Sequence, residues 1–151
     1  MGLDMYLTKK IFIGANYDHR NMEVNIKITK EGEEIKINPK RVSYIEEAIG
    51  YWKKANHIHK WFVDNCQNGK DECQDSYVST DDLKKLLEVC QLVKNNHSLS
   101  QELLPTQSGF FFGGTEYGEG YFQDIDQTIE IISTILDEDD LHADYHYHAS
   151  W

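Results

Sequence analysis

A long run of residues at helical spacing in the middle of the chain constrains the fold most. Its members, apolar except for one histidine, are Ile45, Ala48, Ile49, Trp52, Ala55, His59, Phe62, Val63 and Cys66. Ser43 followed by Glu46 matches the capping box that opens many helices. Because residues three and four apart share one face of a helix, the run predicts a long central helix over residues 43–66.

Shorter patterns surround this run. Alternating Leu3, Met5 and Leu7 predict a strand within residues 3–14, and residues 22–29 and 34–37 alternate as the arms of a β-hairpin. Helical spacing predicts further helices from Thr80 and from about Asp124, and residues 110–112 and 117–122 are expected as short strands. We therefore expect an α+β fold. It would have a mainly antiparallel sheet of about four to six strands and three helices, one of them long and central.

The length and charge of the chain limit its function. A length of 151 residues is typical of a single domain, expected here over residues 1–151, with residues 137–151 as a flexible acidic and His-rich tail. Against 26 acidic residues there are only 15 basic ones, a net charge of −11. Binding to duplex nucleic acid and to anionic membranes depends on Lys and Arg, so both partners are disfavoured.

Cysteine usage and hydropathy indicate a cytoplasmic setting. The three cysteines are an odd number, and no pair is separated by the two intervening residues of a zinc knuckle. We expect reduced thiols, with Cys66 and Cys90 on apolar helix faces. The sequence contains no secretory apolar run and no stretch near the roughly 20 residues of a membrane span.

The predicted central helix carries an unusual density of side chains that bind ligands. Tryptophan stacks on nucleobases, worth about 1–3 kcal/mol per base, and an amide recognises a base edge. Lys and protonated His hold phosphate. The candidates on this helix are Trp52, Lys53, Asn56, His59, Lys60 and Trp61. The alternative is structural: a core Trp52, with Asn56 and His59 satisfying buried backbone groups.

Other candidates lie outside that helix. In the polar loop before residues 110–112, backbone amides near Gln107, Ser108 and Gly109 are suited to approach a phosphate. The remaining ligand-binding candidates are Asp4 and Tyr6 on one face of the first strand, with Phe111 and Glu116 after the loop. His146 and His148 are weak metal candidates, and an exposed edge or flexible tail is the alternative there.

Several blocks of the sequence resemble a family of small bacteriophage and prophage proteins whose chemistry is uncharacterised. They are the opening MGLDMYL, the stretch IGYWKKANHIHKWF and the stretch LLPTQSGFFFGGTEY with YFQDI after it, spread over most of residues 1–132. The resemblance supplies no functional residue. It implies a setting in which small phage proteins counter host defences, some by sequestering nucleotide signals.

We therefore expect a non-catalytic protein that sequesters a small nucleotide-like immune signal and needs no cofactor. Trp52 or Trp61 would stack on a base and Asn56 and Gln107 would bind its polar edges. Lys53, His59 and the loop amides would hold phosphate, and a homo-oligomer is a reasonable way to complete the pocket. Three alternatives stay open: a protein-binding inhibitor of a host defence factor, a small hydrolase using His59 with Asp4 or Glu116, and a metal-binding protein that holds its metal through His146 and His148.

Overall fold

The fold is α+β, as the sequence predicts. The computed structural model describes residues 2–14 and 25–151. In these residues it contains four α-helices, a four-stranded antiparallel sheet and a separate two-stranded sheet. The helix count is four instead of three because the short α3 (Ser100–Leu103) precedes the last helix.

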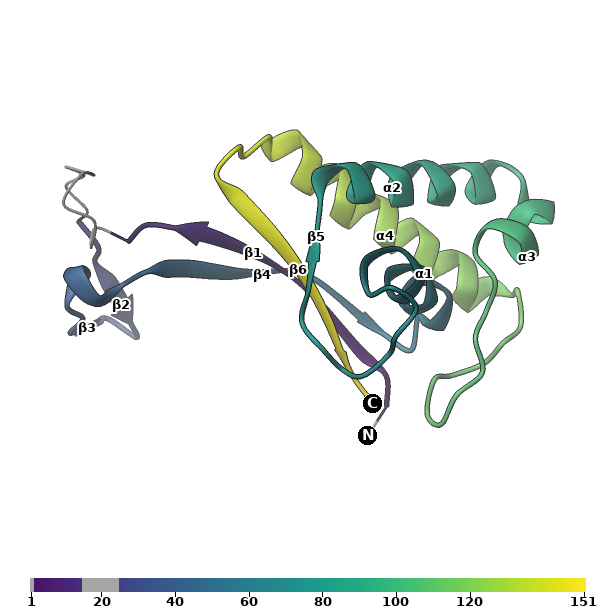
Figure 1. Ribbon diagram of the computed structural model, residues 1–151, viewed down its shortest axis with the longest axis horizontal. Helices are drawn as coiled ribbons and strands as arrows, with labels where there is room; N and C mark the ends of the chain where they lie inside the picture. The colour runs from purple at the N-terminus through teal and green to yellow at the C-terminus, as the bar shows by residue number, and fades with distance from the viewer. Residues whose placement is uncertain (1, 15–24) are drawn as a thin grey trace.

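The helices gather on one side of the larger sheet (Figure 1). In that sheet the strand order is β4-β1-β6-β5. Its strands are β1 (Asp4–Phe12), β4 (Tyr44–Lys53), β5 (Ser76–Val78) and β6 (Ala143–Ser150). The other three α-helices are α1 (Asn56–Cys66), α2 (Thr80–Asn95) and α4 (Glu119–Glu138). Within the described chain, no helix is long and apolar enough to cross a membrane.

The predicted β-hairpin is present. It consists of β2 (Ile28–Lys30) and β3 (Glu33–Ile35), which pair around the turn at Glu31 and Gly32. Residues 22–24 of its predicted first arm lie outside the described residues. The hairpin lies beyond the far ends of β1 and β4, away from the helices (Figure 1). Short 3₁₀ turns occupy Pro39–Arg41 and His97–Leu99.

β1 shows the alternation expected from the sequence. Leu3, Met5 and Leu7 are fully buried on the side of the helices. Asp4 and Tyr6 lie on the opposite, half-exposed face. β1 pairs with β4 on one side and with β6 on the other, so its neighbours come from distant parts of the chain.

The first half of the predicted central helix is wrong: residues 44–53 form strand β4. β4 pairs antiparallel with β1 from Ile45 opposite Ile11 to Lys53 opposite Asp4, and the register shifts once between Leu7 and Thr8. That irregularity interrupts the period of two, which is why the apolar positions mimic helical spacing. Gly50 argues against a helix here, because glycine in a helix interior costs about 1 kcal/mol.

Within residues 137–151, expected as a flexible tail, residues 143–150 form the inner strand β6 and residues 137–138 end α4. Tyr145, Tyr147 and Ala149 are buried toward the helices, while His146 and His148 lie on the other face. The alternating Tyr and His therefore follow a half-buried strand between β1 and β5.

The two strands predicted after the polar loop are absent. Residues 110–112 lie in a turn with Phe110 81% exposed, and α4 already begins at Glu119. Helix formation there buries Tyr121 and Ile125 on one face. That burial gives the segment a stronger driving force than pairing through Gly118 and Gly120 would.

The acidic residues at the end of α4 bind a buried lysine. Lys9 is 6% exposed, and its Nζ lies 2.9 Å from Glu138 and 3.1 Å from Asp140. The hydrogen bond to Glu138 is the main reason that the Lys9 pKa is raised. Asp139, at φ 44°, ends the helix in the left-handed region. The run is therefore more than a solvated helix end.

The three cysteines differ in accessibility. Cys90 is buried and Cys66 half-buried, and burial raises the pKa of each thiol to about 12. Cys73 is exposed in the loop between α1 and β5, with φ 55°. All three are free thiols.

Trp52 belongs to the core. It is fully buried, and its indole Nε1 donates a 2.9 Å hydrogen bond to Oγ1 of Thr128 on α4. Because a buried donor without a partner is costly, we expect Thr128→Val to lower the free energy of unfolding by about 1–3 kcal/mol in urea denaturation.

The matched control is Thr134→Val on the same helix. Each threonine hydroxyl donates to the backbone carbonyl four residues earlier, Thr128 to Asp124 and Thr134 to Glu130. The Thr134 side chain is exposed and has no indole partner among the described residues. Equal losses in the two variants would show that the indole bond contributes nothing.

Candidate functional site

A cleft of about 380 Å³ lies where β4 ends and where α1 and α4 begin. Its remaining wall comes from the loop over residues 104–118. Three of the residues predicted as ligand-binding line it: Lys53, Asn56 and Glu116. It is the candidate functional site.

Asn56 fixes the loop that closes the cleft. Its Nδ2 donates to the carbonyl oxygens of Phe112 at 3.0 Å and Gly114 at 2.8 Å. Its Oδ1 accepts a 2.9 Å bond from the backbone N–H of Gln107. The amide is thus occupied by backbone groups, so Asn56 shapes the cleft instead of binding a base edge.

Both helices that reach the cleft begin without a side-chain cap among the described residues. The N-cap residues are Ala55 for α1 and Gly118 for α4. The first N–H groups of a helix lack partners within the helix, and its N-terminus carries partial positive charge. His57 from α1 and Gly120 from α4 line the same hollow. Two helix N-termini therefore favour an anion there.

Lys53 and Lys54 add positive charge to this opening. Both line the cleft, and no carboxylate of the described residues lies within ion-pair distance of either amino group. Lys54 adopts φ 60°, a conformation uncommon outside glycine, and Gly113 at φ 91° packs closely on it. Strained backbone of this kind gathers at functional sites.

His57 is the buried polar group of the site, and the sequence did not single it out. It is 3% exposed, and its Nε2 has no hydrogen-bond partner among the residues described. Burial lowers its pKa to about 3, so the imidazole is neutral near pH 7. The ring lies against Tyr121, with centroids 4.1 Å apart.

Two carboxylates complete the lining. Burial raises the pKa of Asp124 to about 6. The Glu116 carboxylate folds over Gly114, where its Oε2 leaves no room for a Cβ atom. Carboxylates accept hydrogen bonds from hydroxyl groups, so these two suit a sugar better than a phosphate.

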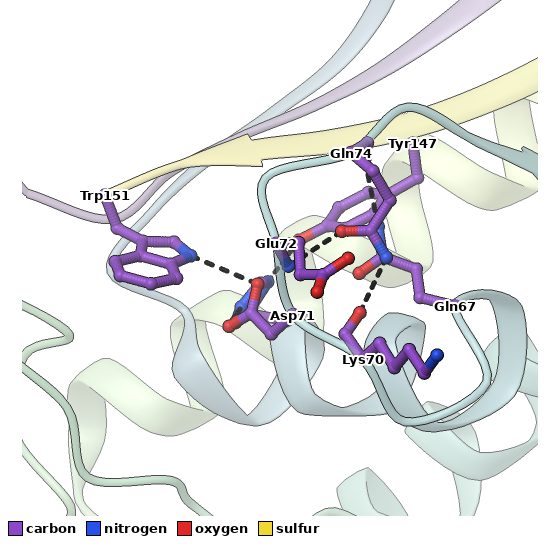
Figure 2. A network of polar contacts seen from close by, with 8 residues as sticks. Gln67, Lys70, Asp71, Glu72, Gln74, Tyr147 and Trp151 are labelled. Carbon is purple, nitrogen blue, oxygen red and sulfur yellow. Dashed lines mark hydrogen bonds and ion pairs between the residues drawn. The ribbon is translucent and has the colours of Figure 1, made fainter.

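His59 is fully buried and does not line the cleft. Its partners Asp71 and Tyr147 are labelled in Figure 2. Its ring nitrogens lie 2.7 Å from the Tyr147 hydroxyl and 2.8 Å from Asp71 Oδ2. Trp151 donates to the other oxygen of Asp71 at 3.1 Å. With the Nε2 proton directed at Asp71, Nδ1 accepts from Tyr147, so both nitrogens are satisfied. The expected phosphate contact by His59 is therefore wrong.

The structure also separates the groups of the hydrolase alternative. Asp4 accepts a hydrogen bond from the Tyr51 hydroxyl on the open face of the sheet. His59 is enclosed on the helical side, and Glu116 lies in the cleft. The sheet and the core therefore keep the three apart.

The remaining candidates lie elsewhere. Ser108, Gly109 and Phe111 are exposed in the loop and do not line the cleft, because Asn56 holds the chain at the preceding Gln107. Trp52 lies in the core, while Lys60 and Trp61 line a neighbouring hollow.

The open face of the sheet holds the other predicted residues. Tyr6 stacks on His148 with centroids 4.9 Å apart, and His146 lies 2.8 Å from Asp75. No group of three potential metal ligands occurs within residues 2–14 and 25–151.

Comparisons with known proteins give no further guide to the site. No family model matches the chain, and neither a curated protein nor a solved structure matches it significantly.

The role of Asn56 is testable by Asn56→Asp. The variant keeps the size of the side chain but turns an oxygen toward the carbonyls of Phe112 and Gly114. We expect faster hydrogen exchange across residues 104–118 and a loss of about 1–3 kcal/mol in unfolding free energy.

Asn65→Asp is the control for this variant. Asn65 lies on the same helix, but it is exposed and makes one hydrogen bond, to the carbonyl of Trp61. Unchanged exchange in the loop of Asn56→Asp would contradict the clamp.

Proposed function

We propose that this protein binds a small phosphate-bearing, nucleotide-like ligand in the cleft and does not convert it. The observation that carries the proposal is the meeting of two uncapped helix N-termini with Lys53 and Lys54, two lysines without an ion-pair partner in the described chain. Phosphate oxygens would accept from the helix N–H groups and the lysines. Asp124 and Glu116 would accept from sugar hydroxyls.

Glycines at the start of α4 support the same proposal. A Cβ at Gly118 or at Gly120 would meet nothing within 4 Å. Gly120 lies in the first turn of α4, and alanine is a better helix former than glycine. Folding therefore does not require glycine at this position, whereas close approach of a ligand to the backbone does.

Binding without turnover would make the protein a store that lowers the free concentration of its ligand. The resemblance to phage proteins suggests a host immune signal as the natural ligand. Stacking on Trp52 is no part of the proposal, because Trp52 is fully buried in the core.

Pyrophosphate is a direct probe of the phosphate site. We expect calorimetric binding to the wild-type protein, and an affinity at least about tenfold lower in the double variant Lys53→Gln/Lys54→Gln. Gly120→Ala should weaken binding while raising the melting temperature, two changes of opposite sign that a general folding defect cannot produce.

The matched control for the lysines is Lys84→Gln/Lys85→Gln. These exposed residues of α2 contact only Asp81 and Asp82 as ion partners in the described structure, and they do not line the cleft. No binding by the wild-type protein, or an equal loss in the control, would overturn the proposed function.

The raised pKa of Asp124 should make phosphate binding in the cleft depend on pH. With a pKa of about 6, its carboxyl is charged at about pH 8 and neutral at about pH 5. The ratio of wild-type to Asp124→Asn pyrophosphate affinity, both measured at the same pH, should therefore rise about threefold to tenfold from about pH 8 to about pH 5, where the two proteins should bind alike. The paired comparison cancels the titration of pyrophosphate itself.

The raised pKa of Asp124 should also make the stability of the ligand-free protein depend on pH. Because folding raises the Asp124 pKa from 3.8 to about 6, the folded state binds the proton more tightly. The wild-type protein should lose stability as pH rises through this interval, and Asp124→Asn should lose less. Identical pH profiles for the two proteins would contradict the assignment.

A further inference from the structure

A second hollow of about 330 Å³ adjoins the cleft, and His57 lines both. It lies between α1 and α3, under Leu104 and Pro105. We propose that the ligand is a guanine nucleotide whose phosphate occupies the cleft and whose base enters this second hollow. The assignment rests on the proposed function, because it takes the phosphate site as given.

The chain places the two hollows side by side. Pro105 lines the second hollow, and the next residue, Thr106, lines the cleft. His57 lines both hollows, so a molecule extending from one into the other passes beside this residue. Such a molecule has a charged end and a flat end, as a nucleotide does.

The walls of the second hollow suit a heterocycle. Trp61, Leu103 and Pro105 provide apolar surface. The Nε1 of Trp61 makes no hydrogen bond within the described chain, so it is available to donate to a ring nitrogen or a carbonyl. Aromatic contact with a base is sequence-tolerant, so polar groups must select which base binds.

The carboxylate of Glu102 selects guanine over adenine in this proposal. Of the two carboxylates in the hollow, Asp64 is paired with Lys60 at 2.7 Å, whereas Glu102 has no cation within ion-pair distance in the described residues. A carboxylate accepts two parallel N–H bonds. Guanine offers such a pair from its ring N–H and amino group, and its O6 and N7 accept from an indole N–H. Adenine lacks the ring donor.

The buried Nε2 of His57, which has no hydrogen-bond partner in the described residues, independently supports a ligand at this place. A buried ring nitrogen without a partner costs free energy, and neighbouring protein groups usually satisfy it. In the proposed complex, a ribose hydroxyl bound beside His57 supplies the missing partner. The neutral imidazole carries no charge that would compete with Glu102 or with the lysines.

The experiment compares GMP, AMP, ribose 5-phosphate and pyrophosphate by calorimetry on the full chain. We expect GMP to bind at least about tenfold more tightly than ribose 5-phosphate and than AMP. Glu102→Gln should remove most of the preference for GMP and leave pyrophosphate affinity unchanged. Glu88→Gln, an exposed charge change on α2, is the matched control and should alter neither.

The outcomes separate the two proposals. If pyrophosphate and ribose 5-phosphate bind while GMP is no tighter, or AMP is tighter, the guanine assignment fails and the phosphate site stands. If none of the four binds, the proposed function itself fails. Loss of GMP binding in Glu88→Gln as well as in Glu102→Gln would overturn the role of Glu102.

Discussion

The three hydrogen bonds of Asn56 are the interaction on which the candidate site depends. One amide joins the start of α1 to Phe112, Gly114 and Gln107, which are far away in the sequence. Without it, the loop over residues 104–118 would have no polar attachment at the point where it passes α1. The cleft is thus a product of tertiary structure, since its lysines lie just before α1 whereas Gly118 and Gly120 lie at the start of α4.

A fixed loop also explains how a strongly acidic protein can present an anion site. The overall charge of −11 is distributed over the whole chain. At the cleft, two lysines and two helix N-termini stand beside the lining carboxylates of Glu116 and Asp124, and salt screens the carboxylates that lie farther away. Lys9 shows the reverse arrangement, since acidic residues enclose a buried cation. Local placement therefore decides which ions this surface attracts.

The sequence predicted the elements whose patterns were local and regular. The alternation of β1 and the apolar stripe of α2 led to the observed strand and helix, and the hairpin was found with shifted bounds. β4 was missed because its register shift against β1 is a property of the pair, invisible in either strand alone. The site followed the same rule. Lys53, Asn56 and Glu116 line one cleft, as expected of ligand-binding residues. His59 was expected to hold phosphate but pairs with Tyr147 and Asp71, whereas His57, for which the sequence predicted no role, lines the cleft.

Because the three thiols differ in burial, Cys73 is the one thiol exposed to reagents in solution. Cys66 and Cys90 are held as neutral thiols by their surroundings, so alkylating reagents meet a reactive sulfur at Cys73. That residue stands two positions after Asp71, which connects its loop to His59 and Trp151. A fluorophore attached there would therefore sense the packing of the inner strand and the first helix while its bulk stayed in water.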